Sequence, residues 1–290
     1  MATLPGMGEL SALLYIKEWH KDKRYDVIVL DCAPTAESLR FISLPTSMKW
    51  YLAHIAPVQR RVLKVLHPIA SLVAPFTMPP ASFFDGVDEL FTRLDGVDEL
   101  LQDPRVTSVR LITDAEKLVV RETQRAFVYF SVCGLTVDQV VVNRVLPEGI
   151  EDAFLKKWDR TQSEFLKEME AYFDPVPTRC VPLFRQEVLG LERVRALARE
   201  LFQGDEDPAA VTRTERPYSF SKRNGVYEVR LQAPFAAKGE IGLFKKGEQL
   251  VVEVGTVRRH IGLPTSLAGL SPARARFDEN TLVVELQESA

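Results

Sequence analysis

A carboxylate directly follows an apolar run in the stretch "YDVIVLDCAPTAESLRFISLP". Val27–Leu30 are continuously apolar, as in a strand buried on both faces, and Asp31 comes next. Ligands of open parallel sheets bind beyond the carboxyl ends of the strands, so Asp31 is placed to hold Mg²⁺ through its water shell, as in phosphate-loop nucleotide hydrolases. Pro34 and Thr35 would form the hinge of a switch. The alternative is that Asp31 or Thr35 caps a helix beginning near Ala36, and local chemistry leaves both interpretations open.

The cysteines and histidines favour no other chemistry. Three distant cysteines without a C-x-x-C pair argue against a disulfide framework, a zinc site or a three-thiolate metalloid site: Cys32, Cys133 and Cys180. We expect Cys133 at a helix end and Cys180 inside a strand. The histidines are too scattered to indicate a metal cluster: His20, His54, His67 and His260. No G-x-S-x-G stretch places a serine nucleophile. We therefore expect neither zinc nor haem.

Composition indicates a soluble globular protein. Of the 290 residues, 46% are hydrophobic and 27% charged, enough to build one large core or two smaller ones. A net charge of -3 gives no reason to expect a nucleic-acid partner. No apolar stretch approaches the roughly 20 residues of a membrane span, and no leader is apparent. We therefore expect a cytoplasmic protein.

Up to about residue 204, strand-like and helical segments alternate. Apolar runs at 106–112, 137–142 and 178–183 predict strands, and residues 151–173 have the periodicity of an amphipathic helix. Another helix is predicted by an apolar spacing near the N-terminus, at Met7, Leu10, Leu13 and Leu14. Continuously apolar strands alternating with helices predict an α/β domain whose parallel sheet is covered on both faces.

The segment between these elements is harder to assign. "FDGVDELFTRLDGVDELLQD" repeats G-V-D-E-L once and predicts an amphipathic helix weakened by Gly96, with an inward face made of Val87, Leu90, Phe91, Leu94 and Leu101. Upstream, "HPIASLVAPFTMPPASFF" is apolar and rich in proline. We expect a loop folded over its own domain, with a groove for an apolar ligand as the alternative.

The C-terminal part has a different periodicity. Residues 205–216 have no apolar pattern and are expected to be a linker. Residues 217–290 contain short alternating runs, such as "VYEVRLQ", "QLVVEVG" and "TLVVELQ", with a turn at Asn224-Gly225. Short strands at this spacing need a second sheet to bury their apolar face, which predicts an all-β sandwich.

The quoted residues carry a family resemblance over positions 5 to about 202. "DCAPTAESLRFISLP" resembles the switch II motif D-T-A-P-T-G-H-T-L-R-x-L-x-L-P of ArsA-type and tail-anchored-protein-targeting ATPases. "VTSVRLITDAEKLVVRETQRAFVYFSVCGLTVDQVVVNRV" and "VPLFRQEVLGLERVRAL" are similar to later strands and helices of that family. The resemblance implies an ATP- and Mg²⁺-dependent ATPase, a homodimer that energises transport, such as an arsenite pump, or delivers a hydrophobic client.

The resemblance also implies roles for individual residues. Asp31 would be the magnesium-linked switch aspartate, and Thr35 would sense the phosphate end with it. The switch itself would comprise Cys32, Ala33 and Pro34. Asn143 would read adenine, with the loop Pro182, Leu183 and Phe184 against the base. Residues 46–104 would form a mobile helical subdomain.

Two departures from the family pattern affect these expectations. Cys32, Ala36 and Glu37 replace Thr, Gly and His, which indicates a subfamily difference. No G-x-x-x-x-G-K-[ST] stretch occurs in the chain. We therefore expect the chain to be the C-terminal part of a longer ATPase: a partial phosphate-loop sheet without its N-terminal strands, with an exposed apolar edge and no appreciable hydrolysis alone.

The last residues resemble a second kind of domain. "NGVYEVRLQAPFAAKGEIGLFKKGEQLVVEVGTVRRHIGLP" and "ARARFDENTLVVELQ" are similar to the α-crystallin domain of small heat-shock proteins, which some bacterial ArsA-like ATPases carry. Its alternating apolar residues are expected to be core rather than a client groove: Leu243, Leu250, Val252 and Val254. The alternative function for the whole chain is a non-catalytic holdase that binds apolar segments through this domain.

Overall fold

The structure is a computed structural model that divides into two compact units, Met1–Leu101 and Gln102–Ala290. It describes residues 7–32, 86, 89, 90, 92–147, 153–223, 226–233, 239, 241–246, 249–254, 257–263, 267, 269–278 and 280–288. Several expectations lie outside these residues: the hinge at Pro34 and Thr35, the switch residue Ala33, the helix near Ala36, the turn at 224–225 and most of the helical subdomain. Among the described helices, none is both long and apolar enough to cross a membrane.

The first unit contains helix α1 (Met7–Lys21), which confirms the helix predicted near the N-terminus. Leu13 and Ile16 are its buried side chains. The Lys17 ammonium donates hydrogen bonds to the backbone oxygens of Arg93 (2.7 Å) and Asp95 (2.6 Å). These bonds fasten α1 to the turn that precedes helix α5 (Val97–Gln102).

Gly96 interrupts the helix predicted over residues 84–103. Its φ of 82° lies in the left-handed region, so the helical residues 92–94 end in a turn before α5 starts. The prediction of one weakened helix is therefore wrong at this position. Leu94 and Leu101 are buried as predicted, and Val97 is fully buried as well.

Val27–Leu30 do not form the strand that their apolar character predicts. Residues 27–32 have no strand pairing, and Val27, Val29 and Leu30 are 53%, 86% and 42% exposed. A strand needs a neighbour to pair its backbone N–H and C=O groups, and no strand among the described residues pairs with this segment. Asp31 therefore follows an unpaired segment rather than a sheet strand.

The second unit begins with the predicted parallel sheet. Its strands are β1 (Val109–Asp114), β2 (Val137–Val145) and β3 (Thr178–Pro182), in the order β1-β2-β3. β2 lies in the centre, and its run Val140–Val142 is almost fully buried, as expected for a strand covered on both faces. On the edge strand β1, Leu111 is buried whereas Ile112 is 62% exposed. Coverage of both faces is thus confirmed for β2 only, and the exposed apolar edge expected from missing N-terminal strands stays a prediction.

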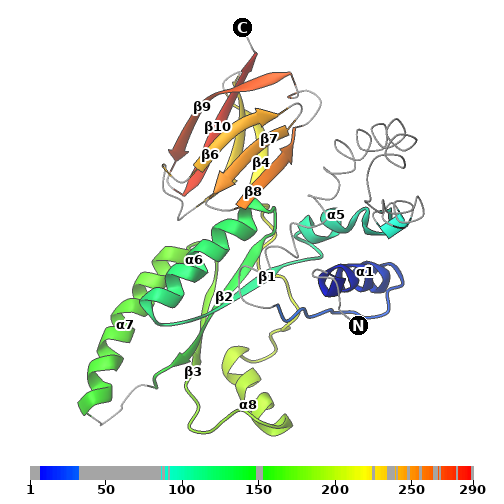
Figure 1. Cartoon of the computed structure of the whole chain (residues 1–290). Helices are drawn as coiled ribbons and strands as arrows, with labels where there is room; N and C mark the ends of the chain where they lie inside the picture. Colours follow the sequence, from blue (N-terminus) through cyan, green and yellow to red (C-terminus); the bar gives the residue numbers. More distant parts are fainter. Residues whose placement is uncertain are drawn as a thin grey trace, which may run out of the picture. The chain divides into compact units, whose positions relative to one another are not determined.

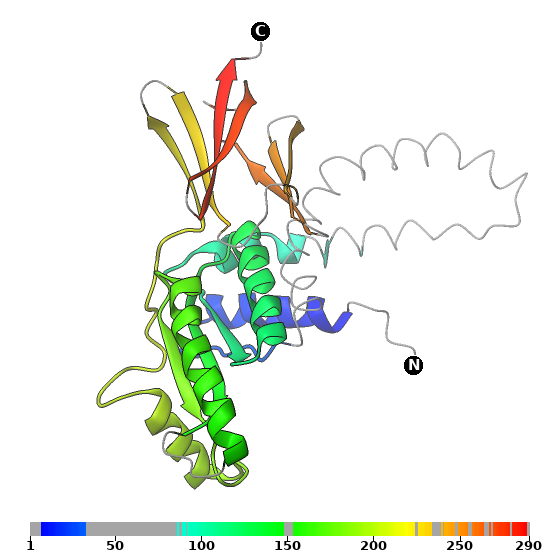
Figure 2. The ribbon, with the colours of Figure 1, turned by 90° about the vertical axis from the view of Figure 1, so that its left-hand side faces the viewer.

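Helices α6 (Lys117–Val132) and α7 (Ala153–Phe173) lie side by side along the sheet in both views (Figures 1 and 2). Phe127 of α6 meets Phe173 of α7 with ring centroids 6.2 Å apart, and Met169 of α7 is fully buried. Helix α8 (Leu191–Leu201) follows β3 and packs against it. Alternation of strand and helix therefore produced the predicted α/β layers.

The predicted β-sandwich is present and consists of two antiparallel sheets. One has the order β4-β5-β10-β9, with bounds Tyr218–Arg223, Val226–Gln232, Thr281–Glu288 and Leu270–Asp278. The other has the order β6-β7-β8, with bounds Ile241–Lys246, Gln249–Val254 and Val257–Gly262. Leu250, Val252 and Val254 are buried in the core between the sheets, and Leu243 packs against it half-buried. Leu250, Val252 and Val254 are therefore core, as predicted, whereas Leu243 lies at the margin of the core.

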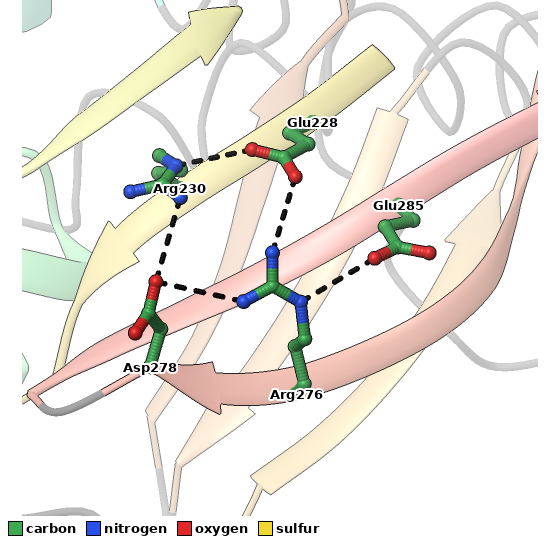
Figure 3. Close-up of polar contacts among 5 residues, drawn as sticks. All are labelled: Glu228, Arg230, Arg276, Asp278 and Glu285. Carbon is green, nitrogen blue, oxygen red and sulfur yellow. Dashed lines mark hydrogen bonds and ion pairs between the residues drawn. The ribbon is translucent and has the colours of Figure 1, made fainter. Parts of the chain in front are cut away.

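The outer face of the four-stranded sheet carries a network of charges (Figure 3). Val283 pairs with Arg230 on one side and Arg276 on the other, so the three side chains share this face. Arg276 contacts three carboxylates: Glu228 at 3.3 Å, Asp278 at 3.5 Å and Glu285 at 3.4 Å. Arg230 pairs with Glu228 at 3.1 Å, and Val283 is completely buried. The aliphatic parts of the arginines account for this burial of an outward-facing valine.

The expected linker is fastened to the parallel sheet along its amino edge. The second residue of each strand holds it: Arg179 of β3 donates to Glu206 (2.6 Å), and Arg110 of β1 donates to the oxygens of Pro208 (2.6 Å) and Ala210 (2.9 Å). Asp138 of β2, fully buried, accepts from the backbone N–H of Thr212 at 3.2 Å. The stretch 203–216 is therefore a strap with fixed contacts, although its sequence has no apolar pattern.

The Glu206–Arg179 contact makes the strap sensitive to pH. Arg179 lowers the pKa of Glu206 below its usual 4.5, chiefly through their hydrogen bond. Because the pKa of this carboxyl group is lower in the folded protein than in the unfolded protein, the ionised group stabilises the fold at pH values above its unfolded-state pKa. This contribution is lost as the pH falls through its folded-state pKa. Glu206→Gln should therefore reduce the urea midpoint at neutral pH, with a difference from wild type that shrinks on acidification below 4.5. Glu200→Gln, an exposed carboxylate on α8, is the control, and a difference that grows on acidification would contradict the assignment.

Candidate functional site

Polar side chains gather where the three parallel strands end. Asp114 is the last residue of β1 and stands in register with Asn143 of β2, while Val145 of β2 is in register with Pro182 of β3. The carboxyl ends of parallel strands are where open α/β sheets bind ligands. Asp114, Asn143 and Pro182 thus define a candidate site, called here the carboxyl edge.

An ion pair joins the ends of β1 and β2. Arg144 Nε donates to Asp114 Oδ1 at 3.2 Å, and a second contact joins Arg144 Nη2 to Asp114 Oδ2. The bidentate arrangement fixes the plane of the guanidinium, and the Asp114 carboxylate raises the pKa of Arg144. Arg144 has a φ of 56°, in the left-handed region that a non-glycine residue rarely adopts. Strained backbone of this kind is concentrated at functional sites, where neighbouring contacts hold it in place.

Arg144 also orients Asn143. Its backbone N–H donates to the side-chain oxygen Oδ1 of Asn143 at 3.0 Å. That bond fixes the amide, and the Asn143 NH₂ group has no hydrogen bond to the residues that the structure describes. Asn143 is half-buried, so it presents a fixed donor group at the carboxyl edge. A fixed amide is suited to hydrogen-bonding a nitrogen heterocycle.

The third side of the edge is the loop after β3. The Leu183 N–H donates to the Val145 oxygen at 2.7 Å, which extends the β2–β3 pairing past Pro182. Leu183 is 44% exposed, whereas Pro182 and Phe184 are half-buried. Asn143 and this loop, predicted as partners from the sequence, are thus brought onto neighbouring strands. Their role toward a base stays a prediction.

The switch residues are not all described. Asp31 and Cys32 are exposed in the first unit, and Ala33, Pro34 and Thr35 fall outside the described residues. The role of Asp31 toward the carboxyl edge of the second unit therefore stays a prediction. Cys133 lies at the C-cap of α6 and Cys180 within β3, as predicted. Within the described ranges, no three His, Cys, Asp or Glu side chains form a group that could hold a metal ion.

Sequence reasoning missed the Asp114–Arg144 pair. The signal was present, because Asp114 ends the apolar run "VRLITD" in the way that Asp31 ends "VIVLD". Arg144 directly follows the predicted Asn143. What the sequence did not show was that adjacent strands would bring the two charges together, since 30 positions separate them.

Comparisons with known proteins agree with this arrangement. Residues 1–203 match the family described as "Anion-transporting ATPase", and residues 224–286 match the "HSP20-like domain found in ArsA". The chain is 40% identical over 288 residues to "Putative arsenical pump-driving ATPase 1" of Aquifex aeolicus, covering 98% of this chain and 72% of that protein. It is 35% identical over 285 residues to "Putative arsenical pump-driving ATPase" of Chlorobaculum tepidum, covering 97% and 70%.

A eukaryotic relative is more distant. The chain is 24% identical over 208 residues to "ATPase GET3" of Komagataella phaffii, covering 69% of this chain and 59% of that protein. The family match starts at residue 1 and gives no support to the expectation that the phosphate loop is missing. That the chain is the C-terminal part of a longer ATPase therefore stays a prediction. The extent of the matches and the parallel sheet lead to one conclusion: the chain belongs to the ArsA family of anion-transporting ATPases and carries the HSP20-like domain of that family.

Proposed function

We propose that the carboxyl edge binds the adenine of ATP in a protein that couples ATP binding and hydrolysis to transport or to delivery of a client. The observation that carries the proposal is the Asn143 amide, held by Arg144 with its NH₂ group available to a ligand. Such a donor fits the ring-nitrogen acceptors of adenine. The exposed Leu183 supplies an apolar surface against the base.

The two aspartates that end apolar runs, Asp31 and Asp114, have different proposed roles, and only Asp31 is assigned to Mg²⁺. Asp114 is engaged by Arg144 and so serves orientation rather than metal binding. Asp31 is an exposed carboxylate, and we assign it the Mg²⁺ contact through water, with Thr35 sensing the phosphate end. ATP would supply the phosphoryl group whose transfer to water drives the cycle. One relative is named as an arsenical pump-driving ATPase, and the switch-like motif also resembles that of tail-anchored-protein-targeting ATPases, so we leave the cargo open between arsenite, a tail-anchored protein and another client.

Removing the Asn143 amide should weaken and broaden nucleotide binding. In Asn143→Ala we expect affinity for a fluorescent ATP analogue to fall about tenfold, and the preference for ATP over GTP to diminish, because about 1–3 kcal/mol of base discrimination is lost. Equilibrium titration of the purified chain measures both. Arg125→Ala, which removes an exposed pair with Glu122 on α6, is the control and should bind like wild type. Unchanged base preference in Asn143→Ala would refute the role.

Hydrolysis by the purified chain should be negligible. Its 290 residues contain no G-x-x-x-x-G-K-[ST] stretch to cradle the phosphates with backbone amides and a lysine. Phosphate release measured with and without Mg²⁺ tests this expectation. Robust Mg²⁺-dependent turnover would show that other residues of the chain bind the phosphates.

The alternative, a non-catalytic holdase that binds apolar segments through the α-crystallin-like domain, is not better supported. Leu250 and Val252 are buried between the two sheets and present no surface to a client. The carboxyl edge also has no part in such a function.

A further inference from the structure

The backbone of Arg144 has a conformation that its residue type disfavours. In the left-handed region, where its φ of 56° lies, the Cβ of an L-residue crowds the backbone. Glycine adopts this region freely and asparagine tolerates it, but arginine has neither property. Within the described ranges, Lys23 in the turn after α1 is the other non-glycine residue with a positive φ. Contacts around Arg144 must therefore stabilise its conformation.

The carboxylate of Asp114 supplies such a contact from the neighbouring strand. It engages both Nε and Nη2 of Arg144, and a bidentate pair restrains direction as well as distance. The carboxylate is itself well anchored. Asp114 is in register with Asn143, and its backbone oxygen accepts a hydrogen bond from the Glu116 N–H at 2.8 Å. The pair therefore ties the side chain of Arg144 to a fixed strand end.

The left-handed conformation occurs where the sheet is irregular. The register of β2 with β3 shifts between Val142 and Val145, so Asn143 and Arg144 lie in the irregular part. Irregularities of this kind re-aim side chains at the ends of strands. Here the Arg144 N–H donates to Asn143 Oδ1 at 3.0 Å instead of continuing the ladder. The direction of the Asn143 amide thus depends on the backbone of the next residue.

We propose that Asp114 is a positioning residue for recognition of the base. Through the Arg144 guanidinium it holds residue 144 in the left-handed conformation, which aims the Arg144 N–H at Asn143 and so fixes the amide that reads adenine. Neither member of the ion pair needs to touch the nucleotide. The last step rests on the proposed function, whereas the coupling of Asp114 to Asn143 is a property of the nucleotide-free protein.

The coupling is tested first without nucleotide. The exchange rate of the Arg144 amide hydrogen, measured by NMR on the full chain, reports the bond to Asn143 Oδ1 directly. In Asp114→Ala we expect this rate to rise at least about fivefold, because residue 144 relaxes to a negative φ and its N–H turns away. Glu192→Ala, which removes the exposed pair with Arg195 on α8, is the control and should leave the rate unchanged.

Base preference is measured next, by equilibrium titration with fluorescent ATP and GTP analogues. Asp114→Ala should reduce the preference for ATP over GTP about fivefold, because a released amide no longer distinguishes the bases. Glycine at position 144 keeps the N–H and adopts a positive φ without an anchor. The double variant Asp114→Ala/Arg144→Gly should therefore be at least about threefold more selective than Asp114→Ala. Such a rescue is not expected if the ion pair only stabilises the fold.

Each result has a defined consequence. Protection of the Val140–Val142 amides checks that a variant keeps its sheet, and Asp114→Asn replaces the alanine variant if that variant does not. Unchanged amide exchange in a folded Asp114 variant, or a double variant as unselective as Asp114→Ala, would overturn the positioning role. If Asn143→Ala loses base preference but Asp114→Ala keeps it, this inference fails and the proposed function stands. If neither variant changes base preference, the proposed function fails, and the role of Asp114 toward a base fails with it.

Discussion

Leu250→Ala is expected to lower the free energy of unfolding of the sandwich by about 3–5 kcal/mol. Truncating this fully buried leucine removes the hydrophobic transfer free energy of the deleted atoms and leaves a cavity in their place. Leu250 lies in β7, the central strand of its sheet, within the core shared by the two sheets. A cavity there has neighbours on both sheets that cannot all collapse into it. The hydrogen-exchange rates of the β7 and β10 amides, measured at increasing urea concentration, give the free energy of unfolding of the sandwich.

Leu243→Ala is the matched control for this substitution. Leu243 lies on the adjacent strand β6 and is only half-buried, so we expect a loss of about 1–2 kcal/mol. The ratio of the two losses distinguishes a core from a client groove. Small and equal losses would mean that Leu250 contributes to a surface, which would revive the holdase alternative.

Asp31→Asn is expected to reduce ATP turnover of the complete gene product at least about a hundredfold, which corresponds to about 2.7 kcal/mol of transition-state stabilisation. Asparagine keeps the shape of the side chain but lacks the charge that orders the Mg²⁺ water shell. We expect the loss in kcat, with nucleotide affinity changed far less. Phosphate release at saturating Mg²⁺ and ATP measures it.

Asp26→Asn is the control, because Asp26 is an exposed aspartate five positions earlier in the same segment. It should turn over ATP at the wild-type rate. Turnover in Asp31→Asn equal to that of the control would show that Asp31 is not the magnesium-linked residue. The cap interpretation would then be preferred, and the assignment of Asn143 would be unaffected, since it rests on the carboxyl edge.

The alternation of apolar strands and amphipathic helices predicted the parallel sheet of the second unit correctly. Val140–Val142 are apolar without interruption, and this pattern has few solutions other than a strand covered on both faces. The sandwich was predictable for a related reason, since period-two alternation in short runs needs a second sheet. Both patterns are local, so a single sequence is sufficient to recognise them.

Val27–Leu30 show where local pattern stops being sufficient. The run is as apolar as Val140–Val142 of β2, but it is unpaired in the structure, because strand formation depends on backbone partners that lie elsewhere in the chain. The strap illustrates the converse. Residues 203–216 have no pattern, and only the tertiary contacts with Arg110, Asp138 and Arg179 give them a defined path.

The sequence by itself determined the family, the two kinds of domain and the candidate Asn143, because motifs and periodicities are written in consecutive residues. Only the tertiary structure decided that Asp114 and Arg144 meet across two strands and that α6 completes the core of the sandwich. Both arrangements join residues far apart in the chain. The physical reason is that such contacts depend on strand register and helix packing, which no local stretch encodes.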